Sequence, residues 1–107
     1  MKIIYNTILP PKGFIAINLF GVLFARKGAT LTERTIRHET IHTYQMKYML
    51  YVFFYLWYGI EWCIRFIQYR NSKLAYYNIS FEREAYANDS NTEYLKYSKP
   101  YSWLKYL

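Results

Sequence analysis

Both histidines of this 107-residue chain lie in one short segment, His38-Glu39-Thr40-Ile41-His42. On an α-helix, side chains at positions i and i+4 share one face about one turn apart, so the two imidazoles can reach the same point in space. The glutamate that follows the first histidine points to the side of that face. The segment therefore requires a helix, and the rest of the chain has to fold so that something meets the two rings.

Local signals predict that helix. Thr30 and Glu33 have the spacing of a capping box, in which the threonine is the N-cap and the glutamate reaches back to its N–H. No Pro or Gly interrupts the chain from there to about Leu50. One helical stripe is expected to hold Leu31, Thr35, His38, His42, Gln45 and Met49. The two histidines are thus expected near the middle of the helix.

The pattern His-Glu-x-x-His is typical of zinc hydrolases, and a catalytic zinc takes three protein ligands plus water. A different interpretation is that the histidines are polar groups packed among the many tyrosines. If zinc binds, His38 and His42 need a third partner, and no other histidine remains. Cys63, the only thiol, lies in an apolar stretch where a buried, inert cysteine is expected. The third ligand is therefore expected to be a carboxylate.

Two glutamates in the segment 80–88 are candidates for that ligand. Ser80 is a suitable N-cap for a helix, and Glu82 and Glu84 follow in or just after its first turn. Carboxylates are also favoured there by the helix dipole, so both could simply stabilise the helix start and face water. Position alone does not decide between these roles.

The order His38-Glu39-x-x-His42 followed by Glu82-x-x-Ala85 resembles the gluzincin metallopeptidases, in which a glutamate on a later helix completes the site. The small members called minigluzincins have about this chain length. Residues 81–86 are also similar to short bacterial proteins with the same HExxH arrangement. The resemblance implies a Zn²⁺ ion bound by His38, His42 and Glu82, with Ala85 as a small packing residue. It also implies a strand beside the motif helix that binds extended peptide.

The chain departs from the family pattern at Tyr86, which stands where an aspartate usually orients a zinc-bound histidine. Asn88 or Asp89 could take that part from the next turn. Glu84, with Asn88 four residues on, stays open as the alternative third ligand, although the E-x-x-A match favours Glu82.

The chemistry that the resemblance implies is hydrolysis of a peptide or protein substrate. Zinc lowers the pKa of its bound water to about 7, and Glu39 would take a proton from that water and pass it to the leaving amine. A tetrahedral intermediate also needs a hydrogen-bond donor, which the tyrosines or Arg83 could supply. Tyr86 is preferred because it shares a helix face with Glu82. The alternative is a non-catalytic protein that binds zinc or associates with a membrane surface.

The expected fold is α+β, with residues 1–107 forming one minimal zincin-like domain. Three main helices are expected beside a β-hairpin or short sheet. The hairpin, or a bent strand, is predicted over 14–26. The second and third helices are predicted over 51–70, with Asn71 as a stop, and over 81–97. The tail 101–104 is expected to pack back on the core or in a groove, and it could also lie across the metal as a plug.

Composition limits the partners and the compartment. A single cysteine excludes an intrachain disulfide, and no signal peptide is apparent, so a cytoplasmic protein is expected. A net charge of +7 with 22% aromatic residues suits peripheral contact with an anionic membrane. The uncharged run 49–60 is too short to span one. The Lys and Arg residues form no dense run, so no nucleic-acid partner is expected. The oligomeric state stays open.

Overall fold

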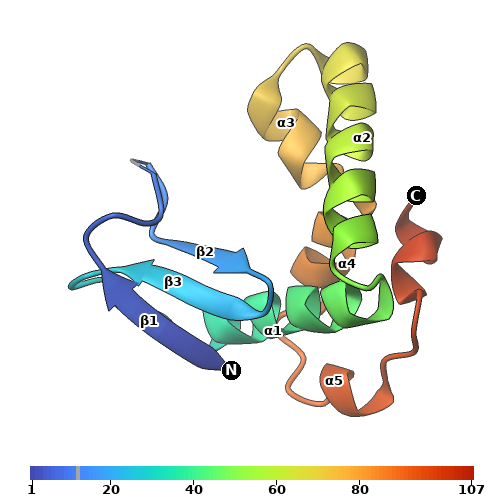
Figure 1. Cartoon of the computed structure of the whole chain (residues 1–107). Coiled ribbons are helices and arrows are strands. Elements are labelled where there is room, and N and C mark those ends of the chain that lie inside the picture. The colour runs from blue at the N-terminus through green and yellow to red at the C-terminus, as the bar shows by residue number, and fades with distance from the viewer. Residues whose placement is uncertain (12) are drawn as a thin grey trace.

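A computed structural model describes residues 1–11 and 13–107 of the chain. A three-stranded sheet comes first, and helices follow it (Figure 1). The strands are β1 (Lys2–Asn6), β2 (Ala16–Leu19) and β3 (Val22–Arg26), in the order β1-β3-β2. β1 runs parallel to β3, whereas β2 runs antiparallel to it. The sheet is therefore mixed, and β2 is one of its edge strands.

The predicted hairpin over 14–26 is confirmed as β2 and β3. Phe20 and Gly21 join the two strands with φ values of 52° and 89°. Two positive φ angles in a row are typical of the tight turns whose twist matches that of antiparallel strands, and glycine adopts this conformation without strain. The side chain of Asn18 holds the turn by accepting a hydrogen bond from the Gly21 amide at 3.0 Å.

The helices lie beside and beneath the sheet (Figure 1). They are α1 (Glu33–Tyr48), α2 (Val52–Tyr69), α3 (Ser72–Tyr77), α4 (Ser80–Asn88) and α5 (Tyr94–Tyr97), with a 3-10 turn η1 (Ser102–Tyr106) near the C-terminus. α1 runs from beneath the sheet to the foot of α2, and α3 folds back along α2. The α+β class with three main helices, α1, α2 and α4, is confirmed. No single helix in the described ranges is both long and apolar enough to cross a bilayer; only α1 and α2 taken together, bent by 112°, have that length and composition.

The start of α1 differs from the prediction. Thr32, not Thr30, is the N-cap, and its hydroxyl accepts a hydrogen bond from the Thr35 amide at 3.1 Å. Glu33 is consequently the first helical residue and not the third. Both threonines are chemically suitable caps, so the choice depends on the path of the chain after β3, which residue type alone does not reveal.

The predicted helix over 81–97 is wrong beyond Asn88. α4 ends there because Asp89 turns inward and is only 3% exposed, and the chain resumes helical structure only in α5. The short helix α3 was not expected at all. Asn71 does follow the end of α2, but its side chain caps the start of α3 by accepting from the amides of Lys73 and Leu74.

Aromatic side chains from distant segments form the core. Phe54 of α2 and Phe81 of α4 are fully buried, with ring centroids 4.5 Å apart. Trp103 of η1 packs against Phe81 at 4.7 Å and is 6% exposed. The tail therefore packs back on the core, as expected, and its buried residue contacts the aromatic cluster rather than the histidines.

A buried carboxylate ties α2 to α4. Glu61 is 4% exposed and accepts hydrogen bonds from the amide and the hydroxyl of Ser80, and from the Trp57 indole at 3.0 Å. Ser80 was predicted to be the N-cap, but the structure makes Ile79 the cap residue and Ser80 the first residue of α4. The free amide at the helix start is thus bonded by a side chain from another helix.

Replacing Glu61 by alanine should destabilise the protein by about 3 kcal/mol, because two buried donors on Ser80 lose their acceptor. Urea unfolding measures the change. Glu93→Ala is the control, since Glu93 is exposed and pairs only with exposed Lys96, and it should change stability by less than about 0.5 kcal/mol. Equal effects of the two substitutions would contradict the capping role.

Candidate metal centre

Three buried side chains from α1 and α4 meet at one point. His38 Nε2 and His42 Nε2 lie 3.2 Å apart, and Glu82 Oε1 lies 3.1 Å from the first and 3.0 Å from the second. His38, His42 and Glu82 are 7%, 4% and 3% exposed. Their potential ligand atoms all lie within 4.8 Å of one another. The fold therefore brings His38, His42 and Glu82 together in a group that can hold a metal ion.

The distances suit a small tetrahedral ion. Zinc–nitrogen and zinc–oxygen bonds of 2.0–2.1 Å place tetrahedral ligand atoms about 3.3 Å apart. The three observed separations, 3.0–3.2 Å, are close to that edge. Without a cation, these two imidazole nitrogens and one carboxylate oxygen can be linked only by the few protons that the histidines carry. The donor set and its spacing therefore fit an ion.

Asp89 orients the ring of His38 through the nitrogen that does not face Glu82. Its Nδ1 lies 3.0 Å from Asp89 Oδ2, and Asp89 in turn accepts hydrogen bonds from Arg34 Nε at 2.8 Å and, on its carbonyl, from Arg37 at 2.6 Å. A carboxylate on Nδ1 keeps the proton there and leaves Nε2 free to bind a metal. Of the two replacements considered for the missing aspartate, Asp89 occupies this position, whereas Asn88 donates to the carbonyl of Glu84.

The ring of His42 is oriented through a chain of polar groups. Its Nδ1 lies 2.7 Å from Gln45 Oε1, and the Gln45 amide donates to Glu84 Oε1 at 2.9 Å and to the Phe81 carbonyl at 3.1 Å. Because both outer partners are acceptors, the amide NH₂ must face them and the oxygen must face the ring. Nδ1 of His42 therefore keeps its proton, and Nε2 is the nitrogen that can bind a metal.

Glu84, the alternative third ligand, is not in the group that meets at the histidines. It is buried on the outer side of Gln45 and accepts hydrogen bonds from Gln45 and from the hydroxyl of Tyr94. Glu84 therefore acts on His42 through Gln45. The geometry favours Glu82 over Glu84 as the residue that can complete a metal site.

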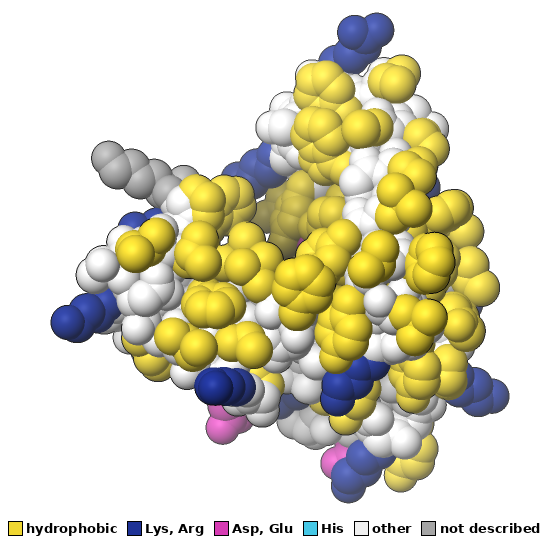
Figure 2. Space-filling view, viewed as in Figure 1, with side chains coloured by type: hydrophobic (Ala, Val, Ile, Leu, Met, Phe, Trp, Pro, Cys, Tyr) yellow, Lys and Arg dark blue, Asp and Glu magenta, His cyan; other side chains and the backbone are white. Residues whose placement is uncertain are grey.

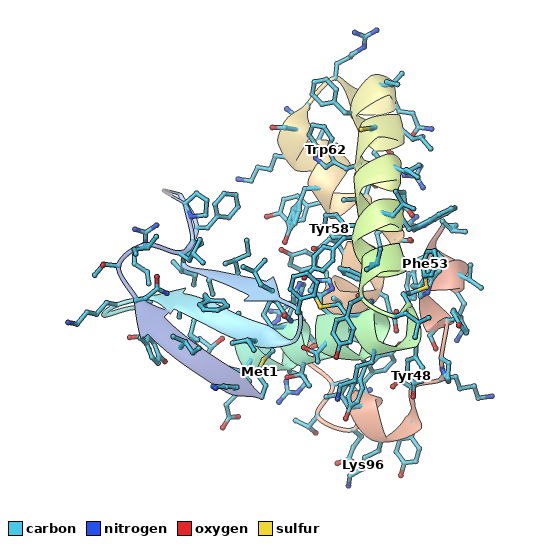
Figure 3. The ribbon with its side chains drawn as sticks, in the orientation of Figure 1. Met1, Tyr48, Phe53, Tyr58, Trp62 and Lys96 are labelled. Carbon is cyan, nitrogen blue, oxygen red and sulfur yellow. The ribbon has the colours of Figure 1, made fainter. Side chains whose placement is uncertain are left out.

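Two tyrosines, Tyr58 and Tyr86, contact the His-His-Glu group. Tyr58 donates its hydroxyl to Glu82 Oε2 at 2.7 Å, and Figure 3 shows it on the side of α2 that faces α4. The ring of Tyr86 lies 4.4 Å from that of His38, and its hydroxyl is 3.2 Å from the hydroxyl of Tyr76. Tyr86, the predicted hydrogen-bond donor, is thus beside the site and 38% exposed. Arg83, the other candidate, instead donates to the Tyr106 carbonyl at 2.6 Å.

The electrostatics of the group favour a cation. Burial alone would lower the pKa of His42, but the Glu82 carboxylate outweighs it and raises that pKa to about 9. Burial would raise the pKa of Glu82, yet the charge of His42 and hydrogen bonds from both histidines and Tyr58 hold it well below its ordinary value. The carboxylate is therefore ionised and attracts positive charge to the point where the ligands meet.

Glu39 lies beside this group without a partner of its own. Its Oε2 atom is buried and has no hydrogen-bond partner within the described part of the chain. Burial raises the pKa of Glu39, partly opposed by the nearby charges of His42 and His38. A buried carboxylate oxygen without a donor is rare in folded proteins, and it calls for a ligand or water at this position.

Sequence reasoning missed Tyr58 and the roles of Gln45 and Glu61. Gln45 lay on the predicted stripe of α1, where a polar side chain at a buried position was a usable signal. Tyr58 and Glu61 are three residues apart, and Glu61 is the single acidic residue of a mostly apolar helix, which marks the inward face of α2. Neither signal says which distant group these side chains meet.

Comparison of the chain with protein-family models, with curated proteins and with solved structures finds no match. The resemblance to gluzincins therefore depends on the residues of the site. The site and the fold together define a class: a small α+β domain in which His38 and His42 of α1 and Glu82 of α4 form a buried group that can bind a metal ion.

Proposed function

We propose that this protein is a zinc-dependent metallopeptidase. The observation that carries the proposal is the meeting of His38 Nε2, His42 Nε2 and Glu82 Oε1 at 3.0–3.2 Å. The buried Glu39 Oε2 atom, which has no hydrogen-bond partner within the described residues, lies beside them. Two neutral imidazoles and one carboxylate are the ligand set that zinc takes in many metallopeptidases. The proposed ligands are His38, His42 and Glu82, and Glu39 is the proposed general base.

Each residue has a distinct part in the proposed reaction. A bound zinc ion would act as a Lewis acid that lowers the pKa of water and polarises the substrate carbonyl. Glu39 accepts a proton from the attacking water and delivers it to the nitrogen of the leaving amine. The Tyr86 hydroxyl donates a hydrogen bond to the oxygen on which negative charge develops. Tyr58 keeps its proton, because burial and then Glu82 raise its pKa, and so it holds Glu82 in place.

The surroundings of Glu39 suit an extended peptide. Asn18 on the edge strand β2 donates to the Glu39 carbonyl at 2.9 Å and to the Thr43 hydroxyl at 3.0 Å, so the edge of the sheet is fixed beside the motif helix. The surface between the sheet and the column of α2 and α3 is hollowed (Figure 2). An edge strand can bind a substrate through main-chain hydrogen bonds, which gives affinity with little sequence preference.

The test measures metal and hydrolysis on the same sample. The purified chain, stripped with a chelator and reloaded with zinc, should hold close to one zinc per chain and cleave a pool of quenched-fluorescence peptides. The stripped protein should not cleave them. Zinc bound without cleavage would favour a non-catalytic zinc-binding protein, and failure to bind zinc would exclude both the peptidase and that zinc-binding alternative.

Replacing Asp89 by asparagine should weaken zinc binding by about 10- to 100-fold, because the amide no longer supports the Nδ1–H tautomer of His38 as a carboxylate does. Competition with a chromophoric chelator measures the affinity. Arg34→Ala is the matched control: it removes the other contact of the Asp89 side chain but does not touch the histidine. The control should retain affinity within a few-fold, and an equal loss in both variants would argue against the orienting role.

A further inference from the structure

The outward face of α2 is apolar along its whole length. Val52, Leu56, Ile60, Ile64 and Ile67 recur every three or four residues and form one stripe, here called the α2 stripe. Each is between 45% and 68% exposed. Cys63, expected to be buried, is also exposed on this helix. Soluble helices rarely present so long an aliphatic surface to water.

Two polar side chains of α2, Tyr58 and Glu61, lie on its other face, whereas Gln68 near the end of the helix is exposed. Tyr58 is bonded to Glu82 and Glu61 to Ser80, so both point into the protein. Figure 3 shows Tyr58 and Trp62 on one side of the helix and Phe53 on the opposite side. Only Phe54 and Glu61 are buried on this helix. The arrangement is the reverse of the usual one, because a carboxylate is inside and aliphatic side chains are outside.

The charges around the stripe are positive. Of the seven acidic residues, only Glu33 and Glu93 are exposed, and neither belongs to α2. Exposed Lys47 precedes the helix, and exposed Arg70 and Lys73 follow it. Figure 2 shows Lys and Arg side chains at the margins of an extensive hydrophobic surface. The buried carboxylates cancel little of this charge for a partner that approaches from outside.

We propose that the α2 stripe docks on the surface of a lipid bilayer that contains anionic lipids. Apolar side chains enter the boundary between headgroups and acyl chains, and flanking cations meet the headgroups. A protein partner fits less well, because the stripe offers no hydrogen-bonding side chain and interfaces carry about one hydrogen bond per 100–200 Å². A second copy would bring two chains of +7 together.

The helix is placed to lie in the plane of the membrane. Its 18 residues form a single uninterrupted helix, and Trp57, which is 37% exposed and lies next to the stripe, can reach the interface, where such a ring is favoured. The opposite face of α2 remains bonded to α4 through Tyr58 and Glu61. Docking therefore requires no opening of the core and does not depend on a bound metal.

The experiment is cosedimentation of the full chain with two kinds of vesicle: phosphatidylcholine alone, and phosphatidylcholine with about one third phosphatidylglycerol. The wild type should bind the anionic vesicles, less strongly as salt is added. Leu56→Asp/Ile64→Asp should lower the partition coefficient at least about tenfold. Both positions are exposed, so the circular dichroism spectrum and the melting temperature should not change. The wild type stripped of metal with a chelator should bind as the untreated protein does.

Ile8→Asp/Phe14→Asp is the charge-matched control, because it adds the same two charges at exposed apolar side chains away from α2. It should retain binding within about threefold. Equal loss in the two double variants would overturn the proposal, since charge alone would then explain the binding. The proposal would also be overturned if the wild type did not bind vesicles but formed a dimer, and if Leu56→Asp/Ile64→Asp were monomeric. The stripe would then be a contact between two copies of the chain.

Discussion

Glu39→Gln should bind zinc as tightly as the wild type and lose peptide hydrolysis by about 10²- to 10⁴-fold, the usual contribution of a general base. Glutamine has nearly the same shape but cannot accept a proton from water. Because Glu39 is not one of the three side chains that meet at Nε2 and Oε1, the metal content should be unchanged. Initial rates at saturating zinc measure the effect, with metal content determined on the same preparations.

Stability separates this catalytic role from a structural one. Glu39 Oε2 has no hydrogen-bond partner in the described structure, and burial raises the pKa of Glu39 more than the charges of His42 and His38 lower it. Removing the negative charge should therefore not lower the melting temperature of the metal-free protein. Glu33→Gln, an exposed carboxylate at the start of the same helix, is the control and should retain full activity. If Glu39→Gln hydrolyses peptides at more than about a tenth of the wild-type rate, another group is the base.

The parts of the site that follow from helix periodicity could be predicted from the sequence. His38 and His42 share a face because they are four residues apart, whatever the rest of the chain does. The assignment of Glu82 needed a second motif, and that of Asp89 only a choice between two neighbouring residues, Asn88 and Asp89. Tyr58 could not be assigned, because its contact with Glu82 depends on how α2 packs against α4. Periodicity identifies the face of a helix but not its partner.

The fold likewise has parts that local sequence predicts and parts that depend on contacts between distant residues. The hairpin of β2 and β3 and the span of α2 follow from turn residues and apolar runs that are local in sequence. The pairing of β1 with β3 joins Lys2 to Val22 and Asn6 to Arg26, across about twenty residues, and no local signal predicts it. The end of α4 was misplaced for a related reason. Asp89 leaves the helix to reach His38 and Arg34 on α1, and these contacts outweigh the intrinsic preference of the following residues.

His42→Ala should abolish the stabilisation that zinc gives. For the wild type, free zinc at a hundred times its dissociation constant adds about 2.7 kcal/mol to the free energy of unfolding. For a domain of this size that raises the melting temperature by roughly 10 °C or more. Without the second imidazole, two ligands remain and the shift should disappear. Glu82→Gln keeps the side-chain volume and removes the charge, so it tests the same point if His42→Ala folds poorly.

The zinc-induced rise in melting temperature should also depend on pH, and it should become larger as the pH rises. In the metal-free protein Glu82 raises the pKa of His42 to about 9, so at neutral pH an incoming ion has to displace a proton from that ring. Apparent zinc affinity should therefore rise by about tenfold per pH unit up to about pH 9. The protonated pair stabilises the metal-free fold fully below the ordinary histidine pKa of about 6.5, and this contribution is lost as pH rises through about 9. The two changes are the same displacement of the His42 proton, and it increases the zinc-induced shift in melting temperature between pH 6.5 and 9. A shift that stays constant over this range, or that persists in His42→Ala, would show that zinc binds elsewhere.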